Sequence, residues 1–489
     1  MGLAAGEAFG LAWVALVPLW MGVRQAQPRY LLAAIAWGLA YYGISLFWLT
    51  GLHPMTWMGV PWLASVAIAA FCWIAVTLWG TAYVAAWAAG MAWLSRRLGA
   101  GHAPTFVLAG TAGWCALELL RSATPLHWSY LGLTQSPHNL AVLQLAQLAG
   151  PTAVTAVLVA TNGLLAEAIL ARWGPRSPGP IPLAGAALAV LLGGHGLGWG
   201  MLARPLASAQ AEPLQVGIVQ GNVPNEIKLK GRGRRQAIAR YTRGYRQLTA
   251  AGADAVLTPE TALPLAWPQY ARRREQFYRA VVAAEVPAWL GAFGAEGQTN
   301  SLFALTGEGQ TRDRYDKAHL VPLGEYVPLE GILGGAVDRL SPLESRLAAG
   351  ELGQTFETAW GPAIAGICYE SAFAHHFRQQ AARGGRFILS ASNDAHYSRA
   401  MPAQHHNQDV MRAIETDRWA VRATNTGYSA IVDPRGRTQW ISGFETYATH
   451  LGTITPRQTQ TPYVRWGNWL TWGLVGAAAA SWGWAEWCR

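Results

Sequence analysis

Ala365-Gly366-Ile367-Cys368-Tyr369-Glu370-Ser371 places a thiol at the end of an apolar run and directly before polar residues. The run over 363–367 has the length and composition of a short buried strand. The carboxyl ends of parallel strands open into a crevice, which is where α/β proteins usually bind their ligands. Cys368 is therefore a candidate nucleophile, although a free cysteine is also a common core residue.

Two other motifs place a charged side chain where an apolar strand gives way to a loop. They are Leu257-Thr-Pro-Glu260-Thr-Ala-Leu-Pro264 and Tyr315-Asp-Lys317-Ala-His-Leu-Val-Pro-Leu-Gly-Glu325-Tyr-Val-Pro328. A thiol is only partly ionised near neutral pH, so Cys368 needs a proton acceptor, and Glu260 can serve as one. Acyl transfer also builds negative charge on a carbonyl oxygen, which the Lys317 ammonium can stabilise.

Each of these charged residues also has a purely structural explanation. Glu260 can cap the next element, Lys317 can be a surface charge, and Glu325 can form a salt bridge. Taken separately these explanations are the simpler ones. The combination of the three motifs in this order favours a chemical role.

The composition is that of a membrane protein. Of the 489 residues, 52% are hydrophobic and only 13% are charged, against about 25% charged in an average soluble protein. The formal charge of +10 favours anionic partners, which in a membrane are lipid headgroups. The four cysteines and twelve histidines lack the spacing of a disulfide framework or a metal site, so we expect no metal.

Residues 1–205 consist of hydrophobic segments, each long enough to cross a bilayer, which takes about 20 residues. We predict about six spans, at 3–23, 31–49, 62–94, 105–120, 143–170 and 181–202, with 62–94 as one helix. A C-terminal transmembrane helix follows at 466–485. Basic residues lie in the odd-numbered connections, which the positive-inside rule places in the cytoplasm: Arg24, Arg29, Arg96, Arg97, Arg172 and Arg176. The segment between the sixth and seventh spans is then expected on the opposite side.

Residues 212–458 alternate short apolar strands with longer mixed segments, which is typical of an α/β domain. Strands are predicted over 214–219, 255–258, 288–292, 301–305, 363–367, 387–391 and 428–432, and helices over 272–284 and 403–423. The basic segment Lys228-Leu-Lys230-Gly-Arg232-Gly-Arg234-Arg235 is interpreted as a solvated loop or as a loop that rests on anionic headgroups.

The three motifs together resemble those of the nitrilase (carbon-nitrogen hydrolase) superfamily, whose triad is Glu, Lys and Cys. With spans on both sides of this domain, the whole chain resembles the apolipoprotein N-acyltransferases. Further matching stretches are Gln220-Gly-Asn222, Asn300-Ser-Leu-Phe, Ser392-Asn-Asp-Ala395, Gln404-His405 and Arg422-Ala-Thr-Asn425-Thr-Gly427. The resemblance implies an αββα nitrilase-like sandwich beside a polytopic α-helical membrane bundle.

The resemblance also implies roles for individual residues. Glu260 would be the general base, Lys317 the oxyanion stabiliser and Cys368 the acylated nucleophile. Supporting positions in the pocket would be Glu325, Tyr369 and Glu370.

The reaction implied by the resemblance has two steps. An acyl chain passes from a phospholipid, with phosphatidylethanolamine as the expected donor, to the cysteine as a thioester. It then passes to the α-amino group of the diacylglyceryl-cysteine of an apolipoprotein. The resemblance implies a multi-pass protein of the bacterial inner membrane, with its catalytic domain on the periplasmic side, no cofactor and no nucleic-acid partner.

The chain departs from this family in three places. Relatives often carry an aromatic and an acidic residue where this chain reads Ile227-Lys-Leu229-Lys, and usually a Trp where it has His396. The family usually has one further span, so a first helix missing upstream of Met1, or a late start site, is expected.

Two other functions fit parts of the sequence. A membrane-anchored nitrilase-type amidase would use the same triad and hand the acyl group to water, because the acceptor is chosen by access. A transporter or a scaffold with an inactive domain would not need the three motifs.

Overall fold

The computed structural model describes residues 8–25, 29–99, 101–174, 178–206, 211–295, 298–326 and 347–487. The chain divides into two compact units. The helical unit comprises Met1–Thr50, Ala69–Pro205 and Thr461–Arg489, and the sheet unit comprises Gly51–Ile68 and Leu206–Gln460. The expectations for Arg176, Val327 and Pro328 fall outside the described residues.

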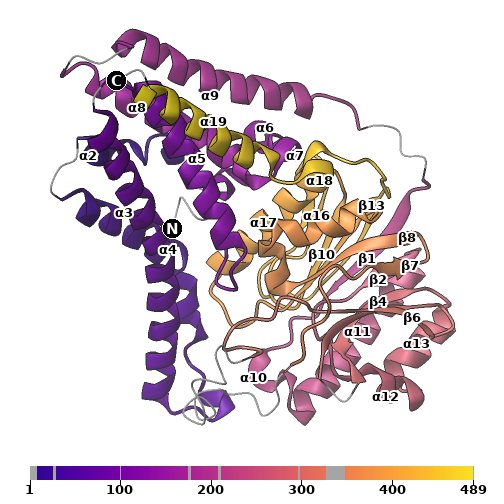
Figure 1. Cartoon of the computed structure of the whole chain (residues 1–489). Helices are drawn as coiled ribbons and strands as arrows, with labels where there is room; N and C mark the ends of the chain where they lie inside the picture. Colours follow the sequence, from indigo (N-terminus) through magenta and orange to yellow (C-terminus); the bar gives the residue numbers. More distant parts are fainter. Residues whose placement is uncertain are drawn as a thin grey trace. The chain divides into compact units, whose positions relative to one another are not determined.

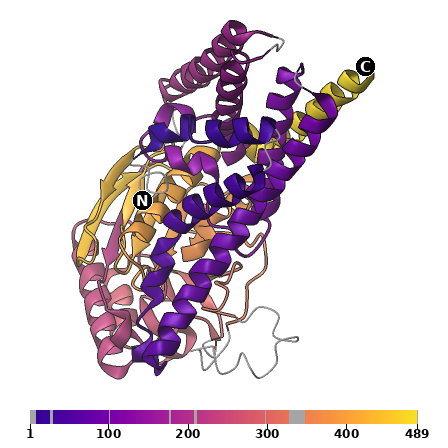
Figure 2. The same cartoon turned by 90° about the vertical axis from the view of Figure 1, so that its left-hand side faces the viewer.

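The helical unit is built from apolar helices (Figure 1). In the described part of the chain, four helices are long and apolar enough to cross a membrane: α4 (Trp62–Leu98), α5 (Ala103–Ser122), α8 (Pro151–Leu170) and α9 (Pro180–Leu202). Shorter helices are α2 (Val17–Arg24) and α3 (Tyr30–Ser45), and α19 (Trp469–Trp487) corresponds to the expected C-terminal helix. Figure 2 shows α4 as one continuous helix, as predicted.

The helix predicted over 143–170 is interrupted. Two short helices, α6 (Leu140–Leu143) and α7 (Ala146–Ala149), precede α8. The break lies at Gly150, whose φ of +77° suits glycine, and a Cβ there would lie 2.4 Å from the Tyr463 ring. Pro151 then starts α8, a position where its missing N–H costs nothing.

Two β-sheets form the centre of the sheet unit. The first has the order β13-β1-β2-β4-β5-β6, with β3 beside β4, and the second has the order β12-β11-β10-β9-β8-β7. The first sheet contains β1 (Leu214–Gln220), β2 (Ala255–Leu257), β3 (Leu263–Ala266), β4 (Ala288–Phe293), β5 (Asn300–Leu305), β6 (Thr311–Asp316) and β13 (Ala448–Ile454). The second contains β7 (Phe356–Thr358), β8 (Gly361–Ile367), β9 (Ile388–Ser392), β10 (Ala420–Thr424), β11 (Ala430–Val432) and β12 (Thr438–Ile441).

Apolar side chains from both sheets form one buried cluster, which includes Leu257 and Trp289 from the first sheet and Ile367 and Leu389 from the second. Helices cover the outer faces (Figure 1). α11 (Gly231–Ala250) and α13 (Gln276–Ala284) pack on the first sheet, and α16 (Ala374–Ala382) and α17 (Ala400–Thr416) pack on the second. The expected αββα sandwich is therefore confirmed.

Parallel pairing brings strand ends together at one edge of each sheet. β8, β9 and β10 are parallel neighbours in register, as are β1, β2 and β4. Cys368 follows β8, Asn393 follows β9 and Glu260 follows β2. Side chains distant in sequence thus meet at the carboxyl ends of the strands, as expected for α/β sheets.

Two predictions for this unit were wrong. The helix predicted over 403–423 ends at Thr416, because Asp417 adopts φ +55° and the chain continues into the buried strand β10. The supposed basic loop is helical, with Lys228 at the end of α10 (Asn225–Lys228) and Arg232 within α11. Lys228 is only 2% exposed, so it is neither solvated nor available to headgroups.

Candidate active site

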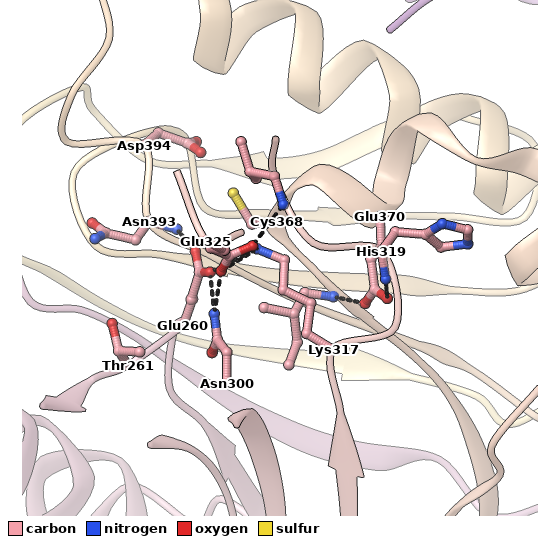
Figure 3. Close-up of polar contacts among 12 residues, drawn as sticks. Glu260, Thr261, Asn300, Lys317, His319, Glu325, Cys368, Glu370, Asn393 and Asp394 are labelled. Carbon is pink, nitrogen blue, oxygen red and sulfur yellow. Dashed lines mark hydrogen bonds and ion pairs between the residues drawn. The ribbon is translucent and has the colours of Figure 1, made fainter. Parts of the chain in front are cut away.

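Glu260 lies in the loop after β2, and three donors fix its carboxylate. Oε1 accepts from Asn300 Nδ2 at 2.6 Å and from Lys317 Nζ at 3.1 Å, and Oε2 accepts from the Asn393 backbone N–H at 2.9 Å (Figure 3). Burial alone would raise the pKa of Glu260, but the neighbouring donors, led by the Lys317 ammonium, hold it below its ordinary value. The carboxylate is therefore charged at neutral pH and can accept a proton.

Gly291 of β4 makes room for the loop that carries this carboxylate. A Cβ on Gly291 would lie 1.9 Å from the Pro259 carbonyl oxygen. Any larger residue would push the loop, and Glu260 with it, away from the sheet.

Lys317 directly follows β6 and joins two carboxylates. Its side chain is 1% exposed, and Nζ lies 3.1 Å from Glu260 Oε1 and 2.9 Å from a carboxylate oxygen of Glu325. Burial alone would lower the pKa of Lys317, but the two carboxylates raise it well above its ordinary value. The site therefore contains a permanently charged ammonium.

Glu325 and Asn300 hold this ion pair in place. Asn300 Nδ2 also donates to Glu325 Oε1 at 3.1 Å, so one amide bridges Glu260 and Glu325. Glu325 Oε2 accepts from the Val321 backbone N–H at 2.8 Å. These bonds to charged partners fix both carboxylates around the ammonium.

Cys368 is the first residue after β8, and its sulfur lies beside these carboxylates (Figure 3). Its φ of +53° is a left-handed conformation that costs a residue with a Cβ about 1 kcal/mol or more. Burial and the Glu260 carboxylate raise the pKa of the thiol well above its ordinary value, against the opposite effect of Lys317. The resting thiol is therefore neutral, and its use as a nucleophile requires a base.

Glu370 connects the two chain segments that carry Lys317 and Cys368. One carboxylate oxygen accepts from the backbone N–H groups of Ala318 and His319, at 2.8 and 3.0 Å. The other accepts from Ile367 N–H at 2.7 Å and from the Tyr315 hydroxyl at 2.8 Å. Its neighbour Tyr369 packs edge-on against Phe373.

His405 and Asp394 lie behind Cys368. His405 Nε2 is 2.7 Å from the Cys368 carbonyl oxygen, and Nδ1 is 3.2 Å from Asp394 Oδ1. One ligand atom each from Cys368, Asp394 and His405 lies within 4.8 Å of the others, as in a metal site. Asp394 also contacts Arg422 at 3.3 Å, and both ring nitrogens of His405 already have hydrogen-bond partners, Asp394 and the Cys368 carbonyl oxygen. We therefore interpret this cluster as one that positions Cys368.

The site therefore brings together Glu260, Lys317, Cys368, Glu325 and Glu370, all of which the sequence singled out. Asn300 and Asn393 were quoted only as parts of matching stretches, although Asn393 directly follows the apolar strand β9, as Cys368 follows β8, and Asn300 begins the apolar strand β5. Lys228 gave no such signal, because it belongs to a run of basic residues whose other members are exposed.

The comparisons with known proteins cover the whole chain. Residues 2–164 match the family model described as the apolipoprotein N-acyltransferase N-terminal domain, and residues 215–462 match the carbon-nitrogen hydrolase model. An apolipoprotein N-acyltransferase of Nostoc is 52% identical over 99% of this chain and 97% of its own length, and one of Synechocystis is 45% identical over 96% of each. The chain belongs to the apolipoprotein N-acyltransferase family. The family predicted from the motifs is confirmed.

A solved structure of a Nesterenkonia amidase from the nitrilase superfamily matches 52% of this chain and 93% of its own chain, with 16% identity and a TM-score of 0.40. The assignment to the N-acyltransferases does not depend on it, because both family models and the relatives' full-length identity support it. The apolar helices agree with the membrane location of this family.

Proposed function

We propose that this protein moves an acyl chain from a membrane phospholipid, through a thioester on Cys368, to the N-terminal amine of a diacylated apolipoprotein. One observation carries the proposal. In a chain of the apolipoprotein N-acyltransferase family, the Glu260 carboxylate, the Lys317 ammonium and the Cys368 thiol converge in one buried cluster.

In the first step, Glu260 accepts the thiol proton and the Cys368 sulfur attacks the ester carbonyl of the phospholipid. Negative charge develops on the carbonyl oxygen, and the Lys317 ammonium stabilises it. The C–O bond breaks, Glu260 returns the proton to the departing alkoxide, and a lyso-phospholipid leaves. The acyl chain remains as a thioester.

In the second step, the α-amino group of the diacylglyceryl-cysteine attacks the thioester carbonyl. Glu260 accepts a proton from the amine, the C–S bond breaks, and the sulfur regains a proton. The products are the N-acylated lipoprotein and the free thiol. Asn300 and the Asn393 backbone N–H support this role for Glu260, because they hold its carboxylate without neutralising it.

The donor and the location are parts of the same proposal. We take phosphatidylethanolamine as the donor and the bacterial inner membrane as the site, with the sheet unit on the periplasmic side. The support is the family for the membrane, and the distribution of basic residues between spans for the orientation.

The test is to incubate purified protein with phosphatidylethanolamine and a diacylated lipopeptide. We expect lyso-phospholipid and triacylated peptide to appear together, and mass spectrometry should find one acyl chain on the peptide that contains Cys368 when the acceptor is omitted. C368A should abolish both products and leave the protein folded. An acyl adduct on any other residue would contradict the mechanism.

An N-acetylated lipopeptide separates acyl transfer from hydrolysis. It lacks the free amine, so we expect no triacylated product from it. An amidase would instead release free acid at the same rate with either peptide. The family assignment does not favour that alternative.

A further inference from the structure

A second buried lysine, Lys228, lies beside the candidate active site. It ends the short helix α10, and its side chain is 2% exposed. The basic residues that follow it, Lys230, Arg232, Arg234 and Arg235, are exposed. Lys228 is therefore the member of this basic run that turns inward.

The Lys228 ammonium contacts the residue that carries the proposed base. Nζ lies 3.2 Å from the backbone carbonyl oxygen of Glu260 and 2.9 Å from Thr261 Oγ1. Thr261 has a φ of +45°, so the ammonium holds a loop whose backbone is strained. These contacts fix the main chain of Glu260, whereas Lys317 fixes its carboxylate.

Tight packing fixes α10 itself. A Cβ on Gly233, in the first turn of α11, would lie 1.9 Å from the Ile227 carbonyl oxygen. Asn225 Nδ2 also donates to His396 Nε2 at 2.6 Å, and Asn225 Oδ1 accepts from the Asn393 side chain at 3.0 Å. The lysine is therefore presented from a rigid support.

The charged and titratable groups that act on Lys228 are Glu260, Cys368 and His396. Burial lowers the pKa of Lys228 to about 8, although Glu260 and Cys368 act to raise it. When the thiol proton moves to Glu260, negative charge leaves the carboxylate and appears on the sulfur. An ammonium that interacts with both groups stabilises the charge in either location.

We propose that Lys228 is a second cation of the acyl-transfer site, a positioning residue that fixes the Glu260 main chain and favours the Cys368 thiolate. The effect of Lys228 on acyl transfer rests on the proposed function. The effect on the sulfur can be measured without any lipid.

The experiment measures alkylation of Cys368 by iodoacetamide as a function of pH, by mass spectrometry of the peptide that contains it. K228M removes the charge and keeps a side chain of similar length. We expect its alkylation profile to move upward over the range below about pH 8, where Lys228 is charged, because a nearby opposite charge is lost. K228R should restore part of the shift, and K230M, at the exposed neighbour, should leave the profile unchanged.

A second variant, T261V, removes only the side-chain partner of the ammonium and keeps Lys228 and its charge. If K228M does not yield folded protein, T261V still tests the positioning role, with a smaller upward shift expected. An unchanged alkylation profile in folded K228M, or in T261V when K228M does not fold, would overturn the proposal.

The same variants are then measured for thioester formation from phosphatidylethanolamine, where K228M should lose at least about tenfold in rate. Alkylation that shifts in K228M while the wild-type protein forms no thioester would retain the role of Lys228 and refute the proposed substrate. If the wild type forms the thioester and K228M changes neither measurement, the proposed substrate is retained and the role of Lys228 is refuted.

Discussion

At the residue scale, a small number of side chains holds the carboxylates of Glu260 and Glu325 around the Lys317 ammonium. Asn300 is the most exacting of these, because a single amide nitrogen serves both Glu260 and Glu325. Hydrogen bonds to charged groups contribute about 1.5–3 kcal/mol each. We expect N300A to lower the rate of thioester formation by about 10- to 100-fold, measured by mass spectrometry in the absence of the acceptor peptide.

N300D provides the matched comparison. It keeps the shape of the side chain but adds a third carboxylate beside Glu260 and Glu325, which already share the single Lys317 ammonium. Like charges disfavour ionisation, so N300D should be slower than N300A. An N300A protein with the wild-type rate would show that the bridge has no kinetic role.

Glu260 gives a second prediction at this scale, for pH dependence. Its pKa lies below the ordinary value, so the carboxylate stays charged above that pKa and loses its function as a base only when the pH falls through it. Thioester formation should therefore not decline between pH 7 and about 5, the upper side of the ordinary glutamate range. An acidic decline centred above pH 5, in protein that remains folded, would contradict this assignment.

The sequence predicted the charged residues of the site and the supporting carboxylates Glu325 and Glu370, but it gave no role to Asn393 or Lys228. Glu260 and Cys368 could be found because each follows an apolar run, whereas Lys317 follows the polar strand β6 and was found through its motif. Asn393 acts through its backbone N–H, a group that every residue except proline has, so its identity carries no signal. The inward turn of Lys228 depends on the packing of α10 against α11, which no local pattern records.

At the element scale, the presence of the buried strands was easier to anticipate than element boundaries. The apolar strands β1, β4, β5 and β8 lie where they were predicted, because each is a continuous buried run. β6 was missed, because five of its six residues are not buried and its sequence is Thr-Arg-Asp-Arg-Tyr-Asp. β10 was taken for the end of a helix, because nothing in the composition of 417–424 marks the left-handed residue Asp417 that separates them.

The short connection before α4 belongs to the sheet unit and supports an active-site loop. The Trp57 ring stacks on His396, with centroids 5.5 Å apart and planes at 12°. His396 contacts Asn225, which contacts Asn393, whose N–H binds Glu260. The resemblance led us to expect a Trp in place of His396, and an aromatic side chain from another segment packs on this histidine.

A stacked aromatic pair contributes about 0.5–1.5 kcal/mol, so W57A should loosen the loop at 393–398 without unfolding the unit. Hydrogen exchange of peptides covering this loop should be several-fold faster in W57A. W62A is the control, because Trp62 is 58% exposed and its ring contacts His53 instead. Equal hydrogen-exchange rates of these peptides in W57A and the wild type would contradict the supporting role of the connection before α4.

At the scale of the whole molecule, the orientation in the membrane rests on basic residues in the connections. Arg96, Arg97 and Arg172 are exposed, as topology signals should be. Arg24 is 4% exposed and pairs with Glu167 at 2.7 Å, so in the folded protein it serves packing inside the helical unit. The first connection keeps Arg29, which is exposed, so the prediction still depends on all three odd-numbered connections.

Cysteine labelling can test this orientation directly. Arg273 is exposed in the sheet unit and Arg97 is exposed at the end of α4. If the odd-numbered connections are cytoplasmic, a membrane-impermeant maleimide should label R273C in intact spheroplasts and label R97C only after permeabilisation. Wild-type protein gives the background from the native cysteines. The opposite pattern would place the sheet unit in the cytoplasm, where Cys368 would face the leaflet opposite to the one that the proposed reaction requires.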